Sequence, residues 1–590
     1  MNNERVIPNN STYDYVSFDV LSNGSPIDES FQIISATVTK EVNRIPTAKL
    51  IIRDGDAALE DFEISNEDVF APGAELEIKS GRDGDNSTIF KGIIVKHGIK
   101  VSESGISQLC IEAKDKSIKM CFGRKNKYFE DSKDSEILEE ILGEYGLKGK
   151  VDATKAKHKE VVQYHSTDWD FLMSRAEVNG LLVMPNDGKV DIKAPDTSSA
   201  PVLNLVYGGN LLSFEAEMNA QNQWASVAGS AWDYSNQALF ESESTSAKFK
   251  ENGNIDGKKL SEVIGLKKFE LRHSGQLKTE ELQAWTDAAI LKSRLAKIRG
   301  NAKFIGYADI KVGDTVKLQG VGDRFNGTAY VTAIRQELLD GAWFTHAQFG
   351  LDPKWFIHKK DIVEPDAAGL LPGIKGLQIG KVVQLEGDPE GDDRILVKLP
   401  IIDNAAKGVW TRLASLDAGQ NRGWVIRPEI DDEVIIGFIN GDPRDSVALG
   451  MLHSSAKPAP IDAKDDNHEK GYVTRSEMKV LFDDEKKIIT IETPAGNSIV
   501  ISEEDKAITI TDQNKNKAVM EPAGITMKSP KDINIEADGN INIKATMNLA
   551  MEGLNVNGKA KTALKMEGSA SAELNGGGTA IVKGGMVMIN

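Results

Sequence analysis

No Phe, Tyr or Trp follows Phe482 in this chain of 590 residues, and this absence sets a narrow limit on what its last part can fold into. Apolar residues in this part alternate with polar ones, as in a β-strand with one buried face. Such pairs are Ile489 and Ile491, Ile499 and Ile501, Ile508 and Ile510, Ile533 and Ile535, and Ile541 and Ile543. A slender β-structure has room for these side chains but not for aromatic rings.

An eight-residue repeat then runs through the end of the chain. Its apolar positions are Ile533, Ile541 and Leu549, then Met566, Leu574 and Val582, and its later glycines are Gly568, Gly576 and Gly584. One repeat holds a short strand and a turn, which bury too little apolar surface to be stable alone. Stacked repeats wrapped around those of identical chains would leave no strand edge free. The pattern favours a β-helical needle over residues 472–590 rather than a disordered tail, because β-branched residues persist throughout.

A block over residues 377–453 has a different pattern. Short period-two runs alternate there with Gly, Asp and Pro turns. The runs are Ile395, Val397 and Leu399, and Val434, Ile436 and Phe438. About five short strands in so few residues predict a small closed barrel of the OB type. Polar or Pro/Gly-rich linkers flank the block at 365–376 and 454–471.

The first 365 residues are predicted to be mixed β-structure with helices. A helix over 134–145 buries one apolar stripe and stops at Gly146. A second begins with a capping box at Thr167 and Asp170 and ends at Gly180. A third is predicted from Thr279 to Arg299. These stripes indicate core packing rather than a cofactor site.

The composition argues against several partners. A formal net charge of −18 repels phosphate, which disfavours nucleic-acid binding and adsorption to anionic lipid. Cys110 and Cys121 have no metal-knuckle or redox spacing, so we expect two buried thiols in a reduced protein made in the cytoplasm. The N-terminus lacks the apolar core of a signal peptide, and no segment approaches the ~20 apolar residues of a membrane span.

Catalytic and metal-binding motifs are not found. The eight histidines form no HExxH pair, 253–259 lacks the spacing of a phosphate loop, and there is no G-x-S-x-G. Neighbouring acids such as Asp392 and Asp393 lie in predicted turns, and His346 is expected to pack in a strand. No His follows His468 and no Cys follows Cys121, so the needle cannot hold a His/Cys metal site. We therefore expect no catalytic, cofactor-binding or metal residues and no cofactor.

From about residue 375 onward the sequence carries an ordered set of Gly, Pro, Trp and charged positions that is specific to one known family. The matching positions are Gly380, Val382, Asp388 to Gly391, Arg394, Val397, Leu399, Pro400, Trp410, Arg412, Pro428, Asp432 to Val434, Gly437, Phe438, Gly441 to Pro443 and Gly450. Earlier ones are Tyr164, Ser166, Trp169, Phe171, Leu172, Arg175, Glu177, Gly180, Val312 to Asp314, Phe325, Gly327, Tyr330 and Val331. In these residues, most strongly from about 375 onward, the chain resembles the VgrG spike proteins of type VI secretion systems and related extracellular contractile particles, which are similar to the fused hub and spike of contractile phage tails. One departure is Asp431, where relatives usually have Gly.

The resemblance implies a mainly β, multidomain protein that forms a homotrimer. A barrel-containing hub with some α-structure would span 1–365, with two barrel-like subdomains and helical insertions. An OB-fold barrel at 377–453, a linker at 454–471 and an intertwined triple-stranded β-helix at 472–590 would follow.

The implied function is that of a structural spike at the tip of an inner tube, which punctures target membranes and is not an enzyme. Its partners would be a hexameric Hcp-like tube protein, baseplate proteins, a PAAR-type tip protein and effector cargo; the membrane would be met only by mechanical penetration. Met586, Val587, Met588 and Ile589 form an apolar patch that would seat the tip protein, or would simply complete the core of the last coil.

The alternative function is that of a β-helical carbohydrate-active or cell-wall-lytic spike enzyme, which the lack of aromatic sugar platforms in the tail disfavours. Some family members have an enzymatic domain after the needle, whereas this chain stops at IVKGGMVMIN and is expected to be the bare structural form. It would be assembled in the bacterial cytoplasm without a signal peptide. It would leave on contraction, or in a released extracellular particle; the sequence does not decide between these.

Overall fold

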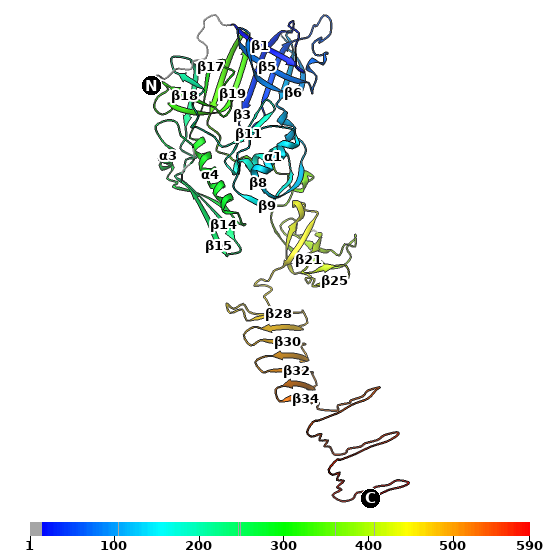
Figure 1. Ribbon diagram of the computed structural model, residues 1–590. Coiled ribbons are helices and arrows are strands. Elements are labelled where there is room, and N and C mark those ends of the chain that lie inside the picture. Colours follow the sequence, from blue (N-terminus) through cyan, green and yellow to red (C-terminus); the bar gives the residue numbers. More distant parts are fainter. Residues whose placement is uncertain are drawn as a thin grey trace. The chain divides into compact units, whose positions relative to one another are not determined.

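A computed structural model describes residues 15–103, 105–245, 247, 249–359, 362–405 and 407–589. The chain divides into two compact units after Gly450, and each is described by itself. Figure 1 shows the strands and helices of both.

A thirteen-stranded sheet organises the part of the first unit that precedes the OB block, for which we keep the short name hub. Its path runs β13 (Leu211–Met218), β17 (Ile298–Ile305), β20 (Ala342–Phe349), β19 (Gly327–Leu339), β3 (Ile33–Glu41), β4 (Thr47–Arg53), β7 (Ser107–Lys114), β6 (Asp85–Val101), β5 (Glu75–Arg82), β1 (Val16–Ser22) and β2 (Ser25–Pro26). Off this path β18 (Thr315–Gln319) pairs with β19, and β12 (Leu203–Val206) pairs with β18 in parallel. The strand order therefore joins the two ends of the hub sequence, since β19 lies beside β3.

Each half of this sheet covers its own core. The core beneath β1 and β3–β7 includes Leu50, Ile52 and Phe90, with Phe70 from the short helix η1 (Asp68–Phe70). The core beneath β12, β13 and β17–β20 contains Phe304 and Phe349 among others. The prediction of two barrel-like subdomains remains a prediction, since the sheet itself runs on without a break.

A helical insertion has the third core of the hub. Its helices are η2 (Lys116–Cys121), α1 (Asp134–Glu144) and α2 (Asp168–Val178). It also contains two two-stranded sheets: β8 (Lys125–Lys133) pairs with β9 (Lys157–Ser166), and β10 (Leu182–Asn186) pairs with β11 (Lys189–Lys193). The predicted helix ends are confirmed. Gly146 and Gly180 follow the two helices with φ of +63° and +69°, which glycine adopts easily. Thr167 caps α2 by accepting a hydrogen bond from the Asp170 amide.

The last hub element pairs a helix with a small sheet. Helix α4 (Thr279–Leu295) packs on β14 (Ser226–Asp233) and β15 (Ala238–Ser244), and β16 (Lys268–His273) completes the sheet. Helix α3 (Gly257–Ile264) precedes β16, and η3 (Phe356–His358) and η4 (Asp366–Gly369) follow β20. The predicted end of the third helix at Arg299 is wrong. Residues from Ile298 onward instead form β17, whose backbone pairs with β13 on one edge and with β20 on the other.

The OB block is a closed barrel of five strands, as predicted. It is formed by β21 (Gln378–Gln384), β22 (Ile395–Lys398), β23 (Val409–Leu413), β27 (Ser446–Met451) and β26 (Glu433–Phe438). A hairpin of β24 (Ala418–Gly419) and β25 (Arg422–Gly423) and the turn η5 (Ile439–Gly441) complete it. Val397, Val434 and Ile436 lie in its core. Asp431 has a φ of +71°, the left-handed region that favours glycine, so its short side chain replaces glycine in the turn.

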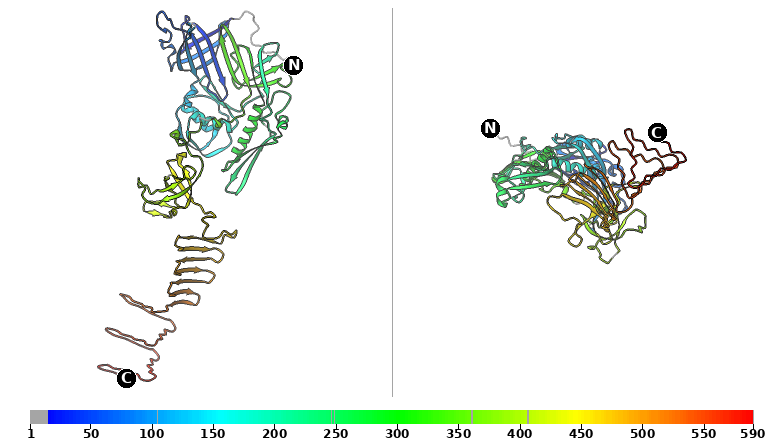
Figure 2. Two further views of the ribbon diagram at one scale, coloured as in Figure 1. Left: turned by 180° about the vertical axis from the view of Figure 1, so that it is seen from behind. Right: turned by 90° about the horizontal axis from the view of Figure 1, so that it is seen from below.

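The C-terminal unit begins with a seven-stranded antiparallel sheet. Its strands pair in chain order: β28 (Glu469–Val473), β29 (Lys479–Asp483), β30 (Ile488–Glu492), β31 (Ser498–Ser502), β32 (Ala507–Thr511), β33 (Lys517–Glu521) and β34 (Gly524–Lys528). Figure 2 shows this ladder of strands from behind. The predicted strands at Ile489 and Ile491, Ile499 and Ile501, and Ile508 and Ile510 are present, but they pair within one chain. The strands predicted at Ile533 and Ile535 and at Ile541 and Ile543 are not formed. None of residues 529–589 belongs to a strand.

Candidate functional site

One face of the C-terminal sheet carries a continuous row of apolar side chains, which we call the isoleucine face. In the pairing register Ile489 lies opposite Ile501, and Ile501 lies opposite Ile508. The members are Val480, Phe482, Ile489, Ile491, Ile499, Ile501, Ile508, Ile510, Ala518, Met520, Ile525 and Met527. Ile489 is 38% exposed and Met527 is 68% exposed. An exposed apolar surface of this length marks an interaction site.

The opposite face of the same strands has another composition. Its central row pairs Thr490 with Val500, Val500 with Thr509, and Thr509 with Val519. Because successive side chains of a strand point to opposite faces, the alternation in the sequence places the isoleucines together and these mixed residues behind them. The two faces therefore differ in what can cover them.

The eight-residue repeats beyond the sheet are also exposed. Ile541 is 50% exposed, Leu549 60% and Leu574 78%. No backbone hydrogen bond joins residues 530–589 to another part of the described chain. Extended backbone with regularly spaced apolar side chains needs partners for both its amides and its side chains.

The predicted seat for a tip protein lies at the end of this segment. Met586 is 80% exposed, Val587 49%, Met588 82% and Ile589 90%. The four residues are neighbours in an exposed apolar stretch, but their role as a tip-protein interface stays a prediction.

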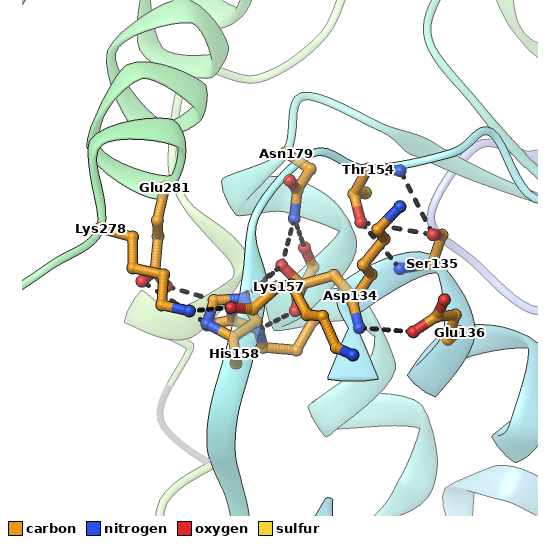
Figure 3. Close-up of polar contacts among 11 residues, drawn as sticks. Asp134, Ser135, Glu136, Thr154, Lys157, His158, Asn179, Lys278 and Glu281 are labelled. Atoms are coloured by element: carbon orange, nitrogen blue, oxygen red, sulfur yellow. Dashed lines mark hydrogen bonds and ion pairs between the residues drawn. The ribbon is translucent and has the colours of Figure 1, made fainter. Parts of the chain in front are cut away.

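The hub contains a buried polar network that the sequence did not predict. Asp134, the first residue of α1, is 1% exposed and accepts hydrogen bonds from Arg175 Nε (2.6 Å), Arg175 Nη2 (3.0 Å) and Asn179 Nδ2 (2.9 Å). His158 Nε2 of β9 lies 3.2 Å from the same carboxylate. Glu281 of α4 accepts from Arg175 Nη2 at 3.1 Å. Figure 3 shows Asp134, His158, Asn179 and Glu281 turned toward one another.

The chemistry of this network is structural. Burial raises the pKa of Asp134, but hydrogen bonds from His158 and Arg175 outweigh it and hold the pKa at about 2. A carboxylate held by Arg175, Asn179 and His158, with so low a pKa, stays ionised near neutral pH and has no proton to donate there. The network joins α1, α2, β9 and α4. A cleft of about 750 Å³ beside it is lined by His158, Trp232, Phe240 and Glu281, among others.

Asp388 holds together the turn formed by the Asp-Pro-Glu-Gly motif of the OB barrel. Its carboxylate accepts hydrogen bonds from the Arg394 guanidinium (Nη2, 2.6 Å) and from the amides of Glu390, Asp392 and Arg394. The Arg394 hydrogen bond, with these amides, holds the pKa of Asp388 well below its usual range. The Asp-Pro-Glu-Gly stretch thus forms a turn closed by an arginine, not a catalytic pair.

The remaining candidates were a metal site, a membrane-spanning helix, His346 and the two cysteines, and each is taken here within the described residues. No group of three His, Cys, Asp or Glu side chains there could hold a metal ion. No described helix is both long and apolar enough to cross a bilayer. His346 lies in β20 with Nε2 3.3 Å from Glu337, in the packed strand that was predicted. Cys110 and Cys121 are free, and both are half-buried rather than buried as expected; partial burial raises the pKa of the Cys121 thiol to about 12.

Two family matches cover most of the chain. Residues 12–340 match the Alg8 N-terminal domain. Residues 378–453 match the type VI secretion system/phage-baseplate injector OB domain, which coincides with the five-stranded barrel.

Two curated relatives are type VI secretion system spike proteins. VgrG1b of Pseudomonas aeruginosa is 22% identical over 382 residues, which cover 59% of this chain and 50% of the relative. VgrG3 of Vibrio cholerae is 29% identical over 113 residues, 18% of this chain and 11% of the relative. The chain thus spans half or less of the length of these relatives. The predicted resemblance to VgrG spike proteins is confirmed.

Among solved structures, the chain is similar to the 43 kDa tail protein of prophage MuSo2 from Shewanella oneidensis. The TM-score is 0.44 at 10% identity, and the match covers 57% of this chain and 98% of that one.

Proposed function

The chain belongs to the family of the Alg8 N-terminal domain, and we propose that it is the trimeric structural spike of a contractile injection machine. The proposal also draws on its match to the injector OB domain and on its isoleucine face. In this proposal the C-terminal unit is the shaft of the spike. The hub and the OB barrel join it to the tube and the baseplate.

The isoleucine face is the observation that carries the proposal. Three copies whose isoleucine faces point to a common axis would close a triangular prism and remove this surface from water. At roughly 25 cal/mol per Å² of buried apolar area, six strands with two apolar side chains each supply a strong driving force for association. Residues 529–589 would continue the shaft as a triple-stranded β-helix in which each chain pairs with its two neighbours.

A shaft of this kind is suited to mechanical work. Strands hydrogen-bonded on both edges leave no free edge at which unfolding or aggregation starts. We propose that the machine supplies the force and that the protein contributes stiffness, with no catalytic step. The target membrane would be met only by penetration.

The partners follow from the same proposal. A hexameric Hcp-like tube protein and baseplate proteins would bind the hub. A PAAR-type tip protein would sit on Met586–Ile589, and effectors would be carried with the spike. Assembly would take place in the bacterial cytoplasm, with export on contraction or release within an extracellular particle.

Neighbouring residues of β31 provide the test. Ile499 lies on the isoleucine face and Val500 on the opposite face of the same strand. We expect the full-length protein to have three times its 64.2 kDa chain mass by light scattering. Ile499→Asp should reduce the trimer fraction by more than tenfold, since three carboxylates would be buried at the axis.

Val500→Asp is the matched control and should leave the mass unchanged. A monomeric mass for the unmodified protein, or equal loss of trimer in both variants, would contradict the proposal. The eight-residue repeats allow a second comparison of the same kind: Ile541→Asp should disturb assembly more than Asn542→Asp.

A further inference from the structure

The sheet formed by β8 and β9 exposes an unusual set of side chains on its outer face. Phe129 and Gln163 point into the hub core and are buried, whereas Tyr128 is 72% exposed, Val162 50% and Tyr164 73%. Tyr128 and Val162 lie directly opposite each other. Phe122, just before β8, is 71% exposed. Exposed aromatic residues grouped in this way are typical of protein interfaces.

Two carboxylates extend this aromatic face. Glu130 lies directly opposite Glu160, two positions along each strand from the Tyr128–Val162 pair, and so on the same face. Like charges placed opposite each other destabilise a sheet. Neither carboxylate forms an ion pair within the described residues, while the nearby Lys127 and Lys159 are held by Glu140 and Asp131. The carboxylates of Glu130 and Glu160 therefore have no cation paired with them in the described chain, and a partner protein can supply one.

A complementary surface lies at the C-terminal end of α3. Val263 is 69% exposed, Ile264 53% and Leu266 40%. In the sequence they are flanked by Lys258, Lys259, Lys267 and Lys268, with Glu262 as the one acid between Gly257 and Lys268. Of these lysines, Lys259 pairs with Glu262 and Lys268 with Glu243, and no ion pair of Lys258 or Lys267 is seen in the described chain. In a chain of net charge −18, this is a local basic and apolar surface.

The two surfaces are separated in the hub. Figure 1 shows α3 and the β8–β9 sheet on different sides of α4, so one chain does not bring them together. A contact between two different surfaces of identical chains is head-to-tail, and it closes into a ring when the rotation between subunits allows.

We propose that the outer face of β8–β9 in one subunit binds the α3 surface of the next, and that this contact closes the hub ring. Tyr128, Val162 and Tyr164 would cover Val263, Ile264 and Leu266. Lys258 and Lys267 would form ion pairs with Glu130 and Glu160 and so remove the repulsion between the two carboxylates. This inference rests on the proposed trimer and names the surfaces that the hub uses in it.

Cysteine cross-linking of the full-length chain tests the contact. In a background with Cys110→Ala and Cys121→Ala, the double variant Tyr128→Cys/Val263→Cys is treated with a short bismaleimide linker. We expect covalent dimers and trimers on a denaturing gel, because each subunit offers one cysteine to either neighbour. Either single variant should stay monomeric on the gel.

A matched control replaces Val263→Cys by Ile99→Cys, which is 54% exposed in β6 and also next to a lysine. The Tyr128→Cys/Ile99→Cys protein should give no covalent trimer. If this protein cross-links as well as the test variant, or if the test variant gives no oligomer although its mass in solution is that of a trimer, the proposed contact is wrong.

Charge reversal gives a second readout on the same variant. Glu130→Lys with Glu160→Lys should lower the rate of cross-linking on the order of tenfold, because like charges then meet. Adding Lys258→Glu and Lys267→Glu should restore it. A rate unchanged by the first pair, or not restored by the second, contradicts the contact. A monomeric mass for the unmodified protein contradicts the trimer instead, so the two failures are distinct.

Discussion

Asp134 illustrates how a single residue holds the hub together. Its carboxylate takes donors from α2 and β9, and the shared Arg175 continues to Glu281 of α4. Asp134 also begins α1, where a negative charge is favoured by the helix dipole. A buried charge of this kind contributes to stability only while all its partners are present.

We expect Asp134→Asn to lower the free energy of unfolding at pH 7 by about 3 kcal/mol, since the charge of Arg175 is then left with Glu281 alone. Asp131→Asn is the control, because its ion pair with Lys159 is exposed to water, which screens it, so its loss should leave the stability nearly unchanged. Urea denaturation of both variants measures the difference. Equal values for the two would show that the network is not what stabilises this part of the hub.

The depressed pKa of Asp134 predicts a dependence on pH. Because the pKa is about 2 in the folded chain and near 3.8 in the unfolded one, the contribution is complete above about pH 5. It should fall by about 2 kcal/mol as the pH decreases through 2. Urea titrations between pH 5 and pH 2 measure this loss, which should be absent from Asp134→Asn.

At the scale of elements, two glycines of the OB barrel show why the same residue type is required in one strand and not in another. A Cβ at Gly380 of β21 would lie 2.4 Å from Val397 Cγ1, inside the closed core. A Cβ at Gly450 of β27 would meet no atom within 4 Å. Neither position needs a positive φ.

Gly380→Ala should therefore destabilise the OB barrel by about 1–3 kcal/mol through overpacking. Gly450→Ala should change the free energy of unfolding by less than about 0.5 kcal/mol. Urea-dependent hydrogen exchange of peptides from residues 378–453 reports on this barrel. A larger effect at Gly450 than at Gly380 would show that Val397 does not pack as described.

Local signals predicted many elements well. The Thr167 cap and Gly146 and Gly180 marked helix ends because capping and left-handed turns depend on nearby residues. The end of α4 was missed because Ile298 to Ile305 gain their structure from β13 and β20, far away in the sequence. Period two also predicted the strands of the C-terminal unit up to Lys528, but it predicted strands at Ile533 and Ile541 that are not formed, and it did not distinguish pairing within a chain from pairing between chains.

On the scale of the whole molecule, association is expected to depend on the C-terminal unit. Removing residues 473–590 deletes the isoleucine face and all the eight-residue repeats. We expect this truncated protein to dissociate at concentrations at least tenfold higher than the full-length trimer. Sedimentation velocity over a dilution series measures both, and equal dissociation would place the trimer contacts elsewhere.

The candidate sites differ in how far the sequence could reveal them. The isoleucine face was visible as alternation, because the pleat converts period two directly into a face. The Asp134 network was not, since its members lie up to 147 residues apart and meet only through the fold. The Glu130–Glu160 pair also needed the register of β8 with β9, which a bulge near Lys125 shifts.

The isoleucine face also bears on the life of the chain before assembly. A newly made single copy presents twelve apolar side chains along one flat sheet, which is the kind of surface that chaperones bind and that drives aggregation. Unpartnered copies should therefore be short-lived or insoluble. High yields of soluble protein are expected only when synthesis brings several nascent chains together, as neighbouring ribosomes on one messenger RNA do.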